Sequence, residues 1–331
     1  MASGGTDTTC WNNVYSPEWD DFIKHHALQD RSSFSSLLEF QGLNATRDAI
    51  IAGLNIHEEL VSALKSSPQD VQIISSYDTA GPLHFGNALV LRQLKAFLNM
   101  GCRVRIPLVD AEAVAVRGLT PDQAVRMAEE TMIPVLNNAG FEKADIYVRS
   151  KVSGIANYMA QLSVAVSKEE QEEIYGHEMD FAKLYSNLYM AADLLRPQLE
   201  EGRQHTLVIY GIDEAPHMKV VNQIADKMGL RPISGLFSPL IPGLHNGKKM
   251  SKSLATSGAN IALNNTPDEA HDKILAYNPV LPEECMVKRL REYFLMRAIG
   301  EKEVCSLQCG SCKQESADAM KTVISHTRQF I

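Results

Sequence analysis

The amino-acid sequence predicts an α/β protein with a Rossmann-type parallel sheet, an N-terminal helical extension and a C-terminal helical domain. Short apolar runs alternate with helical segments from residue 71 to residue 228. Strands that are separated by helices favour a parallel sheet with right-handed crossovers. Two of the runs end in polar turns that contain glycine, and ligands bind beyond such strand ends. We expect domains over residues 1–70, 71–255 (with a helical insertion at about 151–200) and 256–331.

Residues 1–70 contain two helix-like patterns and no motif that carries chemistry. The first pattern covers residues 17–28 and has apolar side chains on one side. The second covers residues 45–66, where Thr46 is a suitable N-cap and apolar side chains recur at helical spacing. We interpret this region as a helical addition to the core.

The strands and helices of the remaining chain follow in regular order. Apolar runs predict strands at residues 71–77, 103–109, 145–148 and 205–210. Helices are expected from residue 86 or 87 to about 100, from Thr120 onward, and over 216–228. Further helices are predicted at residues 267–277, 283–299 and 313–330. The charged run at 168–173 is typical of a solvated helix face within the insertion.

Composition and charge exclude several classes of protein. The chain has 331 residues, 45% of them hydrophobic, so it can bury a large core. Residues 1–9 lack the apolar segment of a secretory signal, and no later run has the length of a membrane span. The formal net charge is −8, so any contact with nucleic acid must use local basic patches. We expect a cytoplasmic protein with no membrane partner.

A lysine-rich loop carries the strongest functional signal. The segment 243–253 ends with three lysines and two serines in six residues, after a turn with glycine. Glycine gives this backbone conformational freedom, and lysine and hydroxyl groups suit a polyphosphate whose charge grows as it leaves. A solvated basic loop is the alternative for such a composition.

A second polar motif, residues 81–87, lies where a predicted strand passes into a helix. A helix N-terminus presents free N–H groups that favour phosphate. Gly86 leaves room for a flat ring close to the backbone, and His84 and Asn87 can donate hydrogen bonds to phosphate or ribose oxygens. A structural turn with an incidental histidine is the alternative.

Two aspartates are positioned to accept hydrogen bonds, one from a ligand and one from a buried donor. Asp213 follows the strand at 205–210, in a position to accept hydrogen bonds from ribose hydroxyls. Asp193 shares a face with Met190 on an apolar helical segment, and a buried carboxylate there needs a donor. A carboxylate at the helix surface is the alternative for Asp193.

Four of the six cysteines lie near the C-terminus, at Cys285, Cys305, Cys309 and Cys312. Thiols at this spacing, ending in Cys-x-x-Cys, fit tetrahedral ligation of Zn²⁺ or an iron–sulfur cluster. Four small buried hydrophobic side chains are the alternative. A secreted disulfide framework does not fit a chain of this length without a signal peptide.

In their order along the chain, these motifs resemble those of class I aminoacyl-tRNA synthetases of the tryptophanyl and tyrosyl subgroup, and most closely the tryptophanyl members. Residues 249–253, Lys-Met-Ser-Lys-Ser, resemble the signature loop, and residues 84–87 resemble the His-x-Gly-His/Asn motif. Residues 211–214 are similar to the Gly-x-Asp-Gln element. Residues 190–193, Met-Ala-Ala-Asp, and residues 309–313, Cys-x-x-Cys-Lys, resemble tryptophanyl segments.

The resemblance implies activation of tryptophan by ATP with Mg²⁺, followed by acyl transfer to tRNA, in a homodimer. It places Lys249 and Lys252 at the phosphates in the transition state, and His84 and Asn87 at the phosphate end of ATP. The other ATP contacts that it implies are Gly86, Asp213, Met250 and Ser251. The amino-acid contacts that it implies are Met190, Asp193 and Glu214. Among them, Asp193 would accept a hydrogen bond from the ring N–H of the substrate. Some family members hold an iron–sulfur cluster on the cysteines of this C-terminal element, and the resemblance extends that possibility to this chain.

Departures from the family pattern leave alternatives open. Glu214 replaces the usual Gln, and Ser186 stands where the family has a pocket tyrosine, with Tyr185 one position away. A phenol hydroxyl can also satisfy Asp193, so tyrosine is an alternative substrate. The segment after Ser253 is shorter than the anticodon-reading part of bacterial relatives. A paralogue that forms adenylates without charging tRNA, and an inactive binding or regulatory module, are the remaining alternatives.

Overall fold

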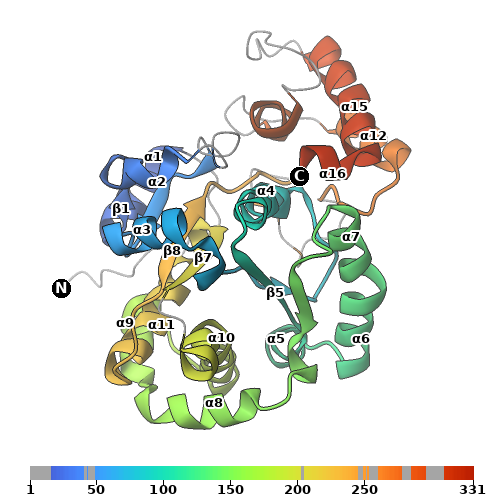
Figure 1. Cartoon of the computed structure of the whole chain (residues 1–331). Coiled ribbons are helices and arrows are strands. Elements are labelled where there is room, and N and C mark those ends of the chain that lie inside the picture. The colour runs from blue at the N-terminus through green and yellow to red at the C-terminus, as the bar shows by residue number, and fades with distance from the viewer. Residues whose placement is uncertain are drawn as a thin grey trace, which may run out of the picture.

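The computed structural model describes residues 16–40, 43, 49–202, 205–244, 249–250, 252, 260–277, 285–295 and 309–331. Within them, eight strands form one sheet at the centre of the molecule (Figure 1). The order across the sheet is β1 (Gln29–Asp30), β2 (Ala52–Leu54), β8 (Ser234–Ser238), β7 (His205–Gly211), β3 (Val71–Ile74), β5 (Arg103–Val109) and β4 (Tyr77–Asp78), with β6 (Asp145–Val148) also paired to β5. β3 runs parallel to β5 and β7, and β7 runs parallel to β8. The predicted parallel α/β fold is confirmed.

Helices cover both faces of the sheet. Side chains alternate between the faces along a strand, so that in β3 Ile73 packs in one hydrophobic cluster and Ile74 in the other. The first cluster includes side chains of α2 (Ser35–Leu38), α3 (Glu58–Ser66), α4 (Phe85–Asn99) and α7 (Ile133–Asn138). The second cluster includes side chains of α8 (Ile155–Leu162), α9 (Lys168–Tyr175), α10 (Phe181–Glu201) and α11 (Ala215–Lys227). In Figure 1, α4 and α10 accordingly lie on opposite sides of the sheet. Strands buried on both faces read as continuous apolar runs, which explains why they stand out in the sequence.

Most predicted elements of the central region are present. β5 and β6 have the predicted bounds, and α8, α9 and α10 confirm the helical insertion. Thr120 caps α6 (Pro121–Arg126), because its Oγ1 accepts from the backbone N–H of Gln123 at 3.3 Å. Two elements lack a predicted counterpart, namely β8 and α5 (Asp110–Arg117), which follows β5 directly.

The N-terminal region differs from its prediction. Helix α1 (Ser16–His25) agrees with the first helical pattern, but the helix predicted over residues 45–66 is wrong for residues 52–54, which form β2. β2 pairs antiparallel with β8 and so extends the central sheet. Gly53 fits there because a Cβ on it would lie 2.8 Å from Cε1 of Phe34. Helix α3 begins only after Asn55, whose φ of +50° interrupts any helix, while Thr46 lies outside the described residues.

The C-terminal helices pack on α4, at the upper right of Figure 1. They are α12 (Pro267–Ala276), α13 (Met286–Leu290) with the π-helical turn Arg291–Leu295, α15 (Cys309–Ser325) and α16 (Thr327–Phe330). Arg92 of α4 donates from Nε and Nη2 to the carbonyl oxygen of Phe330 at 3.0 and 2.8 Å. The ring of Phe294 meets that of Phe85, the first residue of α4, edge-on at 5.4 Å. These contacts tie the C-terminal helices to the helix that carries the polar motif. In the part of the chain that the structure describes, no helix is long and apolar enough to span a membrane.

Candidate active site

A cavity of about 190 Å³ lies beyond the carboxyl ends of the central strands. It is lined by Ser75, Ser76, Tyr77 and Asp78 after β3, by Tyr210 and Gly211 at the end of β7, by Asp213 and Glu214 after it, and by Pro239, Leu240 and Ile241 after β8. The remaining lining residues are His84, Gly86, Asn87, Val90, Arg117, Lys249, Met250 and Lys252. It therefore occupies the place where parallel sheets bind ligands. The histidine motif and the lysine loop, which are far apart in the sequence, line the same cavity.

The N-terminus of α4 presents the histidine motif to this cavity. Asn87 Oδ1 accepts from the backbone N–H of His84 at 3.1 Å, which fixes the first turn of the helix. The ring of His84 is buried, and its Nδ1 has no hydrogen-bond partner among the described residues. Burial, together with the nearby Lys252 and Lys249, lowers the pKa of His84 to about 3, so the ring is neutral. It is thus an uncharged ring, with an unpaired buried nitrogen, in the wall of the cavity.

Gly86 occupies the point of closest approach in this motif. A Cβ at this position would lie 2.9 Å from Cε1 and Nδ1 of the His84 ring and 3.3 Å from Cβ of Met250. Met250 is itself buried, and its backbone N–H donates to the carbonyl oxygen of Ile241 at 2.8 Å. A larger residue than glycine would therefore separate the histidine from the lysine loop.

Both described lysines of the loop bind acceptors of the protein. Lys249 forms an ion pair with Asp213, and Lys252 donates from Nζ to the carbonyl oxygen of Asp78. Burial lowers the pKa of Lys252 to about 8. Burial also acts to lower the pKa of Lys249, but Asp213 outweighs it and raises that pKa. Ser251 lies outside the described residues, so its predicted contact with ATP stays a prediction.

The acidic wall of the cavity follows β7. Asp213 and Glu214 lie in the short 3-10 helix Ile212–Glu214, and the absence of a side chain at Gly211 leaves room for Asp213. The Glu214 side chain is 41% exposed, and its carboxylate lies 3.8 Å from Nε2 of His217. Partial burial, followed by the charge of Asp213, raises the pKa of Glu214 to about 7. The wall thus carries one acid in an ion pair and one acid that titrates near neutrality.

The predicted ring contacts on α10 are Met190 and Asp193, and the structure shows what the aspartate binds in the absence of a substrate. Asp193 is buried, with Oδ2 accepting from Nε of Arg149 at 2.5 Å and Oδ1 accepting from the Tyr147 hydroxyl at 2.9 Å. Neither Asp193 nor Met190, which is also buried, is among the residues that line the cavity. The carboxylate is thus paired within the protein, and its predicted contact with the ring N–H of the substrate stays a prediction.

Sequence reasoning missed Arg149 and Tyr147. Arg149 is fully buried, its guanidinium lies 5.0 Å from the ring centre of Tyr189, and Nη1 lies 3.6 Å from Glu112. The available signal was its position directly after β6, at the same edge of the sheet as the other motifs. Where the family has a pocket tyrosine, Ser186 is buried. The neighbouring Tyr185 is exposed, so its side chain does not take the place of that tyrosine.

The cysteine cluster falls mostly outside the described residues. Cys285 is buried, and Cys312 lies 3.5 Å from Nη1 of Arg291. Cys305 and the side chain of Cys309 are outside the described part of the chain. Among the side chains that are described, no group of three or more potential ligands is arranged to hold a metal ion. Zinc or iron–sulfur ligation therefore stays a prediction.

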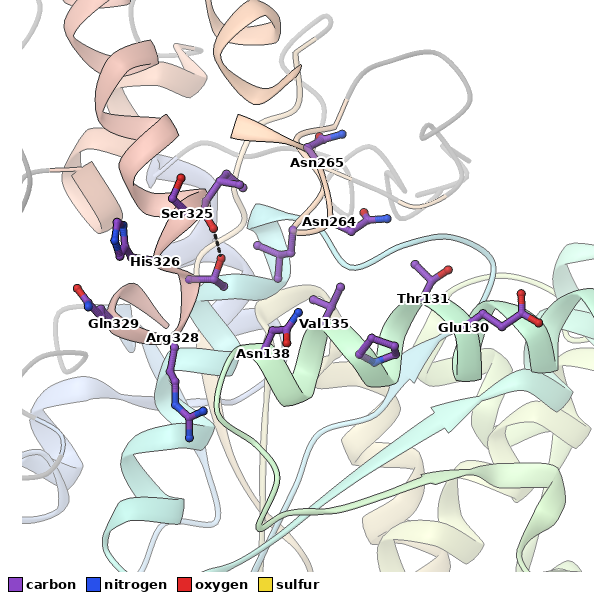
Figure 2. A pocket seen from close by; sticks show the side chains of 14 residues that line it. Glu130, Thr131, Val135, Asn138, Asn264, Asn265, Ser325, His326, Arg328 and Gln329 are labelled. Carbon is purple, nitrogen blue, oxygen red and sulfur yellow. Dashed lines mark hydrogen bonds between the residues drawn. The ribbon is translucent and has the colours of Figure 1, made fainter. Parts of the chain in front are cut away.

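A second and larger cavity of about 720 Å³ lies between α7, the loop at 263–265 and the C-terminal helices (Figure 2). Its rim carries mainly exposed polar side chains, including Glu130, Asn138, Asn264 and His326. It includes none of the residues that the motifs single out. We regard it as the junction between the sheet domain and the C-terminal helices.

Comparison with known proteins places this arrangement in a family. The sequence profile described as tRNA synthetases class I (W and Y) matches residues 66–293. A tryptophan–tRNA ligase of Aeropyrum pernix is 29% identical over 92% of this chain and 89% of that protein, and one of Methanopyrus kandleri is 26% identical over 77% and 75%. The crystal structure of tryptophanyl-tRNA synthetase from Aeropyrum pernix superposes with a TM-score of 0.81, covering 97% of this chain and 95% of that one at 26% identity.

Proposed function

Because this chain belongs to the class I tRNA synthetases of the tryptophan and tyrosine group, we propose that it activates tryptophan with ATP and charges tRNA(Trp). In the first step, a carboxylate oxygen of the amino acid attacks the α-phosphorus of ATP, so that an aminoacyl adenylate forms and pyrophosphate leaves. In the second, a terminal ribose hydroxyl of the tRNA attacks the adenylate carbonyl carbon and AMP leaves. The observation that carries this proposal is the single cavity lined by His84, Lys249 and Lys252.

The roles proposed for these residues are positioning and charge stabilisation, because all bond changes occur between the substrates. Lys249 and Lys252 exchange their present protein acceptors for phosphate oxygens as charge grows on the pyrophosphate. When Lys249 moves, Asp213 becomes free to accept from the ribose hydroxyls. The neutral ring of His84 and the amide of Asn87 bind the phosphate end of ATP, and Gly86 lets the nucleotide approach the backbone.

MgATP is the proposed form of the nucleotide substrate. Mg²⁺ usually keeps several waters and binds through substrate phosphates together with one or two carboxylates. Of the three carboxylates that line the cavity, Asp213 is paired with Lys249, Asp78 lies 3.4 Å from Arg117, and Glu214 has no Lys or Arg partner among the described residues. We propose that the ion enters on the triphosphate, and that the protein contributes the lysines that share the phosphate charge.

Amino-acid-dependent exchange of pyrophosphate into ATP tests this function. Across the twenty amino acids, we expect stimulation by tryptophan and charging of tRNA(Trp) in a second assay. Stimulation by tyrosine alone would assign the other substrate of the family. Exchange without charging would identify an adenylate-forming paralogue, and no exchange with any amino acid would identify an inactive binding module.

We propose the cytoplasm as the site of action, with residues 71–255 catalysing activation and residues 256–331 contacting tRNA.

A homodimer is the proposed assembly, and the N-terminal end of α10 is the surface we assign to it. Phe181 is 79% exposed and its ring stacks on that of Tyr185, with 6.3 Å between the centroids. Aromatic side chains are enriched at interfaces between proteins. We expect Phe181→Glu to shift the protein from dimer to monomer in sedimentation velocity, while Lys183→Glu, on the same helix turn, does not. A monomeric wild type, or a dimeric Phe181→Glu variant, would contradict this assignment.

A further inference from the structure

A short segment after the lysine loop, residues 260–263, lies directly against the histidine motif. Two backbone hydrogen bonds join the two, one on each side of His84. Leu263 donates from its N–H to the carbonyl oxygen of Leu83 at 2.8 Å, and Phe85 donates from its N–H to that of Ile261 at 3.0 Å. We call residues 260–263 the anchor segment, because this backbone supports the residue that presents its ring to the cavity.

Two polar side chains from outside the anchor segment hold it in place. Oδ1 of Asn265, on the loop that leads into α12 (Figure 2), accepts from the backbone N–H of Ala262 at 2.8 Å. Nζ of Lys273, on α12 itself, donates to the carbonyl oxygen of Asn260 at 3.0 Å and to Oδ1 of Asn265 at 3.1 Å. One ammonium group thus ties the start of the anchor segment to the side chain that binds Ala262.

Helix α12 is capped by other residues than these two. Oγ1 of Thr266 accepts from the backbone N–H of Glu269 at 3.2 Å, and Oε2 of Glu269 accepts from the backbone N–H of Thr266 at 2.8 Å. This reciprocal pair is a capping box, which satisfies two backbone donors at the start of a helix. Lys273 lies in the last turn of α12, yet its ammonium reaches back to the loop before the helix. Its bonds therefore hold the anchor segment, not the cap of α12.

The anchor segment is closed to water. Its residues are all buried, with exposed fractions between 0% and 7%. Water does not readily replace a hydrogen bond that is lost at such a place, so the backbone shifts to regain one. Because the segment is bonded on both sides of His84, a shift of this backbone is passed to the histidine motif.

We propose that Lys273 and Asn265 are positioning residues for adenylate formation, which act by holding the anchor segment against the histidine motif. This inference rests on the proposed function and deepens it, since neither residue lines the cavity that we assign to ATP. Through the two side chains, a helix of the C-terminal domain determines where His84 stands relative to the lysines of the loop. A misplacement of reacting groups by about 1 Å can cost about 10²-fold in rate.

The first turnover of adenylate formation tests this proposal, because it gives a rate constant and an amplitude separately. Lys273→Met removes the ammonium and should lower the rate constant by about 10–10²-fold, while the amplitude, the adenylate formed per protein, stays that of the wild type. Lys321→Met is the matched control, because Lys321 also pairs with α12, through Asp268 at 2.8 Å. Its rate constant should stay within about twofold of the wild type. An unchanged rate constant in Lys273→Met, with or without a lower amplitude, would overturn the proposal, since a purely structural role changes only the amount of active protein.

An exchange of donor and acceptor between residues 265 and 269 tests the part of Asn265. Its Nδ2 donates to Oε2 of Glu269 at 3.2 Å. Asn265→Leu removes the acceptor for Ala262 and should lower the rate constant as Lys273→Met does, whereas Asn264→Leu, at the exposed neighbour, should not. The double variant Asn265→Asp with Glu269→Gln keeps that acceptor and restores a donor–acceptor pair, so its rate constant should stay within about twofold of the wild type. A rate constant as low as that of Asn265→Leu would overturn the role of the amide oxygen.

Hydrogen exchange separates this proposal from the proposed function, because it needs no turnover. The amide protons of Phe85 and Leu263 report the bonds between the anchor segment and the histidine motif. In Lys273→Met we expect both to exchange about tenfold faster, with the amides of β3 and β7 unchanged. If the wild type forms no adenylate with any amino acid but these two amides respond, the proposed function fails and the anchoring of the motif stands. If the wild type forms adenylate and the two amides exchange equally in both proteins, the proposal about Lys273 fails.

Discussion

Replacing Lys252 by methionine lowers kcat for adenylate formation by about 10²–10³-fold, the effect of removing one preorganised charge-stabilising donor from a transition state. In the resting protein, Nζ of Lys252 donates to the carbonyl oxygen of Asp78, beside the buried ring of His84. In the proposed mechanism, phosphate oxygens replace this acceptor when the nucleotide binds. Methionine keeps an unbranched side chain that replaces the lysine stem but supplies no donor and no charge. Steady-state pyrophosphate exchange with saturating ATP and amino acid measures the loss.

Two further variants make this result specific to the cavity. Lys143→Met makes the same chemical change at an exposed residue and should leave kcat within a factor of about two, as expected for a surface substitution. Lys252→Arg retains a positive charge at every accessible pH. Since the pKa of Lys252 is lowered to about 8, the wild type loses the lysine charge as pH rises through that value, and the corresponding fall is absent from the arginine profile. Equal rates for Lys252→Met and Lys143→Met would rule out the transition-state role.

The location of the site could be predicted because its motifs are local to strand ends. His84 and Gly86 lie at the start of α4, and Asp213 follows β7 within two residues. The carboxyl ends of adjacent parallel strands meet at one edge of the sheet, so residues that are distant in the sequence converge without any knowledge of side-chain contacts. Lys249 reaches the same edge because its loop follows β8, which is parallel to β7.

Pairings between elements could not be predicted in the same way. Asp193 was expected to need a donor, but Arg149 and Tyr147, which supply it, come from another strand and the turn after it. Periodicity shows that a face is buried and says nothing of which polar groups meet inside. The apolar residues 50–54 fit a helix or a strand equally well, and pairing of β2 with β8 decides between them. Tertiary contact overrides local propensity in both cases.

Replacing Arg149 by methionine should lower the free energy of unfolding by about 3–5 kcal/mol, the usual cost of removing one partner from a buried ion pair. The side chains of Arg149 and Asp193 are 1% and 0% exposed, so water cannot take the place of the guanidinium. Tyr147 would remain as the one described donor to the Asp193 carboxylate. Urea unfolding at neutral pH, followed by circular dichroism, measures the change.

One property of this loss distinguishes a buried unpaired charge from a simple cavity. The double variant Arg149→Met with Asp193→Leu removes the charge altogether and should recover most of the stability, since apolar replacement of a whole buried pair is often neutral. A loss that is not recovered in the double variant would mean that Arg149 stabilises the fold by packing on Tyr189 and not by neutralising Asp193.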